Sequence, residues 1–167
     1  PKDSKSIEFF KIVQNKLHFE AHGHTPPEVI YKRANSDKPF MGLTTYKGDL
    51  PVMSYVIIAK NYLTEEELKI LNNLVSGYFD FAEIQAIRHI PMYMDDYVKQ
   101  LDIILSSTGE KLLVGAGTIS HNKAIEKSNE DLKSQLSKYE SLMNNLQITI
   151  GELSNQKVNE KYRAEIE

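Results

Sequence analysis

Cysteine is absent from this chain of 167 residues. Its absence excludes a disulfide framework, a thiolate nucleophile and any zinc site built on cysteine, and it fits a reducing compartment. Long apolar runs are missing as well, because stretches such as 56–59 and 112–114 fall far short of the ~20 residues that span a bilayer. We therefore expect a cytoplasmic protein with no membrane helix, and nothing in the pattern calls for a cofactor.

A strong charge of either sign is also lacking, since 20 Lys and Arg residues are set against 23 Asp and Glu residues. The formal net charge of −3 argues against polyanion binding over the whole surface and leaves room for a local basic patch. We expect no export signal, because no basic-then-apolar segment opens the chain. The chain begins with Pro1 rather than methionine, so we expect sequence upstream to be missing.

Two helices are predicted at the start of the chain. Apolar residues at spacings of three and four mark one buried face between Ser4 and about His18. The members of this face are Ile7, Phe10, Val13 and Leu17. A second helix is expected from Thr25 to about Asn35, because threonine, two prolines and Glu28 form a capping box. Residues 36–51 then lose the apolar period, which predicts a long connection with a short extended piece at 43–46.

Three further helices are predicted in the middle of the chain. Residues 52–62 are expected to form a buried helix, with a strand as the alternative because of their β-branched content. A second capping box at Thr64 opens a long helix that runs to about His89 and forms the spine of the core, with Tyr78 and Phe79 buried. Pro91 forces a break before a helix over 95–107, and a glycine-rich joint over 109–117 follows.

The last segment carries apolar residues at alternating spacings of four and three, which is the 3.5-residue average of a coiled-coil seam. The seam residues are Leu132, Leu136, Tyr139, Met143, Leu146, Ile150 and Leu153. The same spacing also fits a helix that folds back onto its own domain. The expected fold is all-α, with a compact multi-helix domain over residues 1–117 and an extended C-terminal helix over 118–167. We expect that helix to form a homo-oligomer, in the simplest case a homodimer.

Several separated passages, at 9–18, 23–25, 38–44 and 59–68, resemble the virulence-associated RhuM family of bacterial proteins. The resemblance covers roughly residues 1–130, and the order of the motifs makes it specific. It implies a virulence- or mobile-element-associated protein with no settled biochemical activity. Family members usually carry, upstream, a segment that resembles a DNA-binding winged-helix or helix-turn-helix module. Since we expect that module to be missing here, its DNA-binding function does not transfer to these residues.

Three histidines lie within seven residues at the end of the first helix. Neutral imidazoles are good ligands for zinc and neighbouring metals, so His18, His22 and His24 form a candidate metal site. The arrangement lacks the HExxH spacing, and Gly23 interrupts the helical register. The alternative is that His18 and His24 form hydrogen bonds with the backbone of the adjoining loop.

An enzymatic site is the second candidate, centred on His24, because histidine titrates near neutral pH and suits general acid–base work. Glu28, Lys38 and Thr44 complete the predicted catalytic set. This hypothesis requires these side chains to converge in one pocket.

The basic loop over residues 31–48 is the third candidate site. Four cations lie there against one acid, interleaved with aromatic residues that suit stacking on bases. The predicted nucleic-acid contacts are Lys32, Arg33, Lys38 and Lys47. The alternative is a solvated loop anchored by its aromatics. The leading functional hypothesis remains a protein-interaction or effector domain that self-associates through the C-terminal helix; whether the chain is an enzyme stays open.

Overall fold

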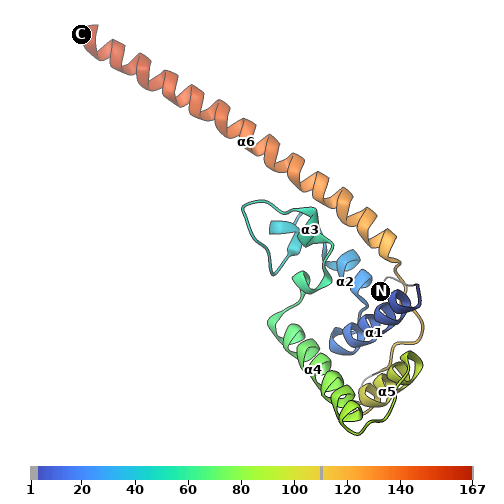
Figure 1. Cartoon of the computed structure of the whole chain (residues 1–167). Coiled ribbons are helices and arrows are strands. Elements are labelled where there is room, and N and C mark those ends of the chain that lie inside the picture. The colour runs from blue at the N-terminus through green and yellow to red at the C-terminus, as the bar shows by residue number, and fades with distance from the viewer. Residues whose placement is uncertain (1–3, 110, 167) are drawn as a thin grey trace.

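The computed structural model describes residues 4–109 and 111–166, and the described side chains reach residue 162. The fold is all-α, as expected (Figure 1). Its elements are α1 (Ser4–His22), α2 (Pro26–Arg33), the 3₁₀ helix η1 (Pro39–Gly42), α3 (Met53–Val56), the 3₁₀ helix η2 (Ala59–Tyr62), α4 (Glu65–Ile87), α5 (Met94–Ser106) and α6 (His121–Ile166). Within the described residues, no helix is both long and apolar enough to cross a bilayer.

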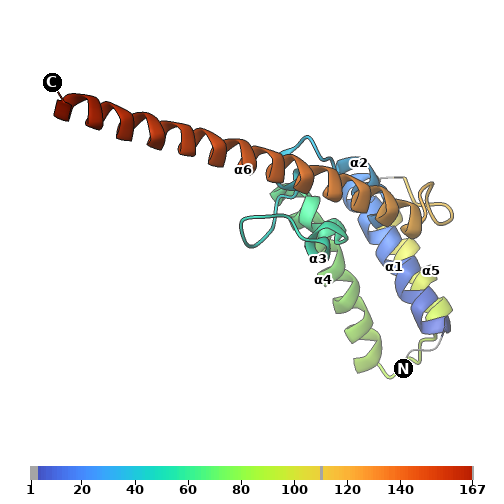
Figure 2. The ribbon, with the colours of Figure 1, turned by 90° about the horizontal axis from the view of Figure 1, so that it is seen from above.

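The helices form a body at one end and a projecting rod at the other. Helix α1 packs against α4 and α5, whereas α2 packs against η2 and against the start of α6. Figures 1 and 2 show α6 leaving this body and continuing far beyond it. Two different environments therefore exist along one continuous helix.

The two predicted capping boxes mark helix starts. In the second, Thr64 Oγ1 accepts from the Glu67 N–H at 3.2 Å, and Glu67 Oε2 accepts from the Thr64 N–H at 2.9 Å. In the first, Glu28 Oε2 accepts from the Thr25 N–H at 2.8 Å. These bonds satisfy N–H groups that have no partner inside a helix, so α2 and α4 begin where the sequence predicts.

The core is continuous from α1 to the first half of α6. Its fully buried members include Val29, Met41, Leu71 and Leu101. Burial of side chains of this size stabilises a fold by about 1.5–3 kcal/mol each.

Three residues of α1 and α4 that were expected in the core are instead exposed. Ile7 and Phe10 of α1 are 59 and 61 % exposed, and Phe79 of α4 is 66 % exposed. Helical spacing correctly placed Val13 and Leu17 inside. The apolar stripe of α1 continues past the elements that cover it, which periodicity alone does not show.

The predicted single helix over 52–62 is wrong, because α3 and η2 are separate. Ile58 between them has extended backbone angles, φ −106° and ψ 110°. The break lets the Tyr62 hydroxyl donate to the buried Val56 carbonyl at 2.9 Å and lets Asn61 Nδ2 donate to the Tyr55 carbonyl at 2.9 Å. These tertiary bonds compensate for the interrupted helix.

The connection over 36–51 contains the 3₁₀ helix η1, and Leu43, the first residue of the expected extended piece at 43–46, has extended angles, φ −64° and ψ 136°. Phe40 and Met41 adopt left-handed angles, with φ 48° and 61°. Such angles are costly for residues with side chains, and here they turn Met41 fully into the core. The Thr44 N–H donates to the Asn61 carbonyl at 2.7 Å, which ties this connection to η2.

The first half of α6 is bound to the body by a buried face. That face consists of Ala124, Ser128, Leu132 and Gln135. Gln135 Nε2 donates to the Lys38 carbonyl at 2.6 Å, and Lys127 Nζ donates to the Ala34 carbonyl at 2.8 Å. These contacts hold α6 against the end of α2 and the segment that follows it.

Candidate functional site

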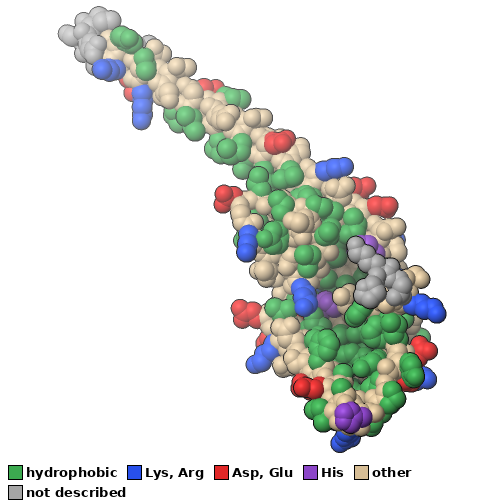
Figure 3. All heavy atoms as spheres, in the orientation of Figure 1, with side chains coloured by type: hydrophobic (Ala, Val, Ile, Leu, Met, Phe, Trp, Pro, Cys, Tyr) green, Lys and Arg blue, Asp and Glu red, His purple; other side chains and the backbone are tan. Residues whose placement is uncertain are grey.

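The distal half of α6 is a surface that lacks packing partners among the described residues. Every described side chain from residue 140 to residue 162 is exposed. Four apolar residues at spacings of three, four and three are between 48 and 63 % exposed; they are Met143, Leu146, Ile150 and Leu153. We call these four residues the distal stripe. Hydrophobic side chains are visible at intervals along the projecting helix in Figure 3.

The predicted seven-residue seam is divided between two environments. Leu132 belongs to the core of the body and Leu136 packs against it, while Tyr139 lies half-buried at the edge. The alternative that this helix packs onto its own domain therefore holds for the first part of the seam. The distal stripe has no such cover from the described residues.

The three predicted histidine ligands form a hydrogen-bonded series. His18 Nδ1 lies 2.9 Å from His22 Nε2, so one ring donates and the other accepts. The His24 Nδ1–H donates to the His22 carbonyl at 3.0 Å, and its Nε2 accepts from Lys32 Nζ at 2.7 Å. Across the described residues, no three His, Asp or Glu side chains are grouped as metal ligands.

Burial keeps two of these rings neutral. Desolvation is the main cause that lowers the pKa of His18 to about 3, and the charges of His22 and Lys60 lower it further. Desolvation also lowers the pKa of His22 to about 4, against the opposing effect of Glu67. A shared N–H···N bond needs at least one neutral ring, so the hydrogen bond and the lowered pKa values agree.

Glu28 fastens the linker between α5 and α6 to the start of α2. Its Oε1 accepts from both the backbone N–H and the hydroxyl of Thr118 at 2.7 Å. Burial would raise the pKa of this carboxyl, but the bonds donated by Thr118 and Thr25 outweigh that effect and lower it to about 2. Gly117 makes the approach possible, because a Cβ there would lie 2.8 Å from Thr25 Cγ2.

The predicted catalytic residues are engaged in separate contacts. Glu28 is occupied by its bonds to Thr25 and Thr118, and Thr44 Oγ1 donates to the carbonyls of Asn61 and Leu63. His24 is held by Lys32. Neither of the two described cavities is lined by His24, Glu28, Lys38 or Thr44.

The basic loop contributes fewer free cations than its composition indicates. Arg33 forms a two-pronged ion pair with Glu67, at 2.5 and 2.7 Å, and also donates to the Tyr62 carbonyl at 2.8 Å. Lys32 contacts His24, whereas Lys38 and Lys47 are exposed. The rings of Phe40 and Tyr46 stack on each other at 3.8 Å rather than standing apart.

Comparison with protein-family models gave a match over most of the chain. The family model described as "Virulence protein RhuM family" matches residues 1–145. The chain belongs to the RhuM family. No curated protein and no solved structure gave a significant match.

The RhuM match extends past the limit near residue 130 that the sequence motifs indicated. It includes the whole body and ends within α6, just before Leu146. Three residues of the distal stripe, Leu146, Ile150 and Leu153, therefore lie beyond the matched region of this RhuM chain.

Sequence reasoning missed the residues that connect distant parts of this RhuM body. Glu67 was expected only to cap a helix start, and Thr118 was expected only to begin the C-terminal helix. The pairing of Thr118 with Glu28 joins positions 90 residues apart. A threonine next to glycine gives no local signal of that partnership.

Proposed function

We propose that this RhuM-family chain is a protein-interaction domain that forms a homodimer through the distal stripe of α6. The observation that supports this function is the exposure of four apolar side chains in coiled-coil register on a helix segment that makes no contact with its own body. An exposed apolar stripe along one face of a helix is typical of a surface that binds another helix.

Helix physics favours a partner for this segment. In proteins, helices owe most of their stability to the packing of one face against another element. The spacing of the distal stripe averages 3.5 residues, which keeps the stripe facing a second helix as the two wind around each other. A second copy offers the same stripe and therefore the same register.

Charge does not oppose self-association here. Between residues 141 and 156 the single charged residue is Glu152. Two copies therefore bring few like charges together along the stripe, in contrast to a solvated helix with many charged faces. Gly151 lowers the helix propensity by about 1 kcal/mol relative to alanine, which favours a reversible rather than a permanent dimer.

Two matched variants test this function. Leu146→Asp places a charge in the stripe and is expected to convert the dimer to a monomer, because an unpaired buried charge is strongly unfavourable. Ile148→Asp makes a comparable change at a residue that is 61 % exposed and lies outside the stripe, so the dimer should persist. Light scattering gives the mass of each variant, and far-UV circular dichroism verifies that both remain helical. An equal mass for Leu146→Asp and the unmodified chain would contradict the proposal.

A further inference from the structure

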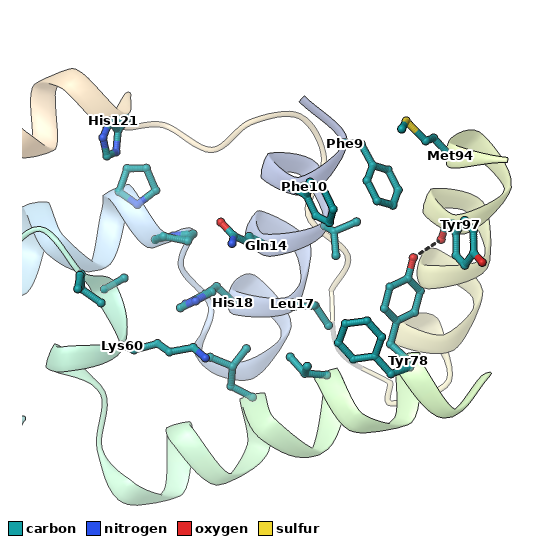
Figure 4. A pocket seen from close by; sticks show the side chains of 18 of the residues that line it. Phe9, Phe10, Gln14, Leu17, His18, Lys60, Tyr78, Met94, Tyr97 and His121 are labelled. Carbon is teal, nitrogen blue, oxygen red and sulfur yellow. Dashed lines mark hydrogen bonds between the residues drawn. The ribbon is translucent and has the colours of Figure 1, made fainter. Parts of the chain in front are cut away.

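A second exposed apolar surface lies on the body, far along the chain from the distal stripe. It is a groove of about 870 Å³ between α1 and α4. Val13, Leu17 and Leu71 form its buried floor, together with Tyr78, whose hydroxyl donates to the Tyr97 carbonyl at 3.0 Å. Figure 4 shows Phe9, Phe10, Tyr78 and Tyr97 facing this space from α1, α4 and α5.

The rim of the groove includes Phe10 and Phe79, two of the residues that the sequence wrongly placed in the core. Phe10 and Phe79 are more than 60 % exposed on opposite sides, and Met94 of α5 is 43 % exposed. Hydrophobic side chains gather over this part of the body in Figure 3. Large aromatic side chains gain free energy by leaving water, so an apolar occupant would be stabilised here.

The formal charge that lines the groove is positive. No Asp or Glu lines it, and Lys60 of η2 is its single lysine or arginine. Among the described residues, no carboxylate pairs with Lys60, whose side chain extends toward the space beside His18 (Figure 4). His18, which lies next to it, is 7 % exposed, and its ring bonds to His22. An unpaired cation therefore lies at one end of an apolar groove.

We propose that this groove binds a small amphipathic anion, with an apolar body against Phe10 and Phe79 and an anionic group at Lys60. Sites for small molecules have cavities of about 300–1,000 Å³, are lined mainly by apolar and aromatic side chains, and contain few oriented polar groups. Between Phe10 and His18 the groove follows α1 for about 12 Å, which accommodates a medium-length alkyl chain or fused aromatic rings. The proposal is independent of dimer formation, because the groove and the distal stripe share no residue.

The first test measures charge recognition with the intact chain. The dye 8-anilinonaphthalene-1-sulfonate, an aromatic anion, reports occupancy, and dodecanoate or dodecanol competes with it. We expect one dodecanoate per chain, bound about fivefold more tightly than the neutral dodecanol because of an ion pair at a partly exposed site. Lys60→Gln should abolish that fivefold preference and leave dodecanol unaffected. Lys69→Gln removes an exposed lysine of α4 outside the groove and should preserve the preference.

The second test locates the apolar part of the ligand. Phe79→Ser should weaken dodecanoate and dodecanol alike, by about tenfold, through loss of contact with an aromatic ring. Ile84→Ser removes another exposed apolar residue of α4 that does not line the groove, and binding should be unchanged. Equal affinity for dodecanoate and dodecanol would overturn the anionic site. Displacement of the dye by an amphipathic helical peptide or by anionic vesicles, with none by dodecanoate, would overturn the small-molecule site.

Discussion

Acid should unfold this protein through two buried histidines. In the folded state, burial lowers the pKa of His18 to about 3 and that of His22 to about 4 from the ordinary value of 6.5. The unfolded chain binds a proton on each ring below pH 6.5, whereas the folded chain keeps both rings neutral until nearly pH 4. Protonation therefore favours the unfolded state. The contribution of these rings to stability is complete above pH 6.5 and is lost as the pH falls toward 4.

The size of the effect follows from this difference in bound protons. Each proton bound only by the unfolded state costs up to about 1.4 kcal/mol per pH unit, so two rings lower the free energy of unfolding by about 3 kcal/mol between pH 6.5 and about 5. That loss is a large part of the 5–15 kcal/mol typical of a folded domain. Above about pH 5 the low pKa values of Glu28 and Glu67 keep both carboxylates ionised, so the hydrogen bonds of Glu28 and the ion pair of Glu67 remain intact.

Urea unfolding followed by circular dichroism at a fixed chain concentration measures this free energy at about pH 7.5 and about pH 5. His18→Gln retains a polar side chain beside His22 and removes one titrating ring, so about half of the pH-dependent loss should remain. His121→Gln replaces an exposed histidine at the start of α6 and should leave the full loss. A free energy of unfolding that is equal at the two pH values would refute the reasoning.

Two substitutions in the body test the contacts that join its distant parts. Gly117→Ala should lower the free energy of unfolding by about 2 kcal/mol more than Gly115→Ala. Both glycines have positive φ, but only a Cβ at 117 would meet buried atoms, those of Thr25 and Glu28. Equal losses in urea unfolding would contradict this packing. Arg33→Ala should cost about 2 kcal/mol by leaving Glu67 without its ion pair and raising the pKa of that carboxyl from about 2. The exposed Lys32→Ala should cost less than about 0.5 kcal/mol in the same assay, and similar costs for the two changes would assign Arg33 a surface role.

Helix starts and stops were predictable because their causes are local. Thr64 and Glu67 form their capping bonds within one turn, and Pro91 precludes continuation of α4 within a few residues. The same logic located α2. The split at Ile58 was not predictable, since the bonds that compensate for it depend on where Tyr62 meets Val56 in the folded core.

The candidate sites show a similar division. Spacing identified the seam of α6 but could not show that Leu132 packs on the body while Leu146 is exposed, since both belong to one period. Composition identified a basic loop but could not show that Arg33 is neutralised by Glu67, which lies 34 residues away. Residue type and local period are visible in a sequence, whereas coverage and pairing depend on the tertiary arrangement.

The molar mass of the unmodified chain in solution tests the proposed interaction function most directly. Size-exclusion chromatography with light scattering, over a range of about 1 to 100 μM, follows an equilibrium of the strength that a short helical seam is expected to give. A mass that rises with concentration to twice the 19.1 kDa of the single chain is the predicted result. A mass of 19.1 kDa at every concentration would contradict self-association through α6.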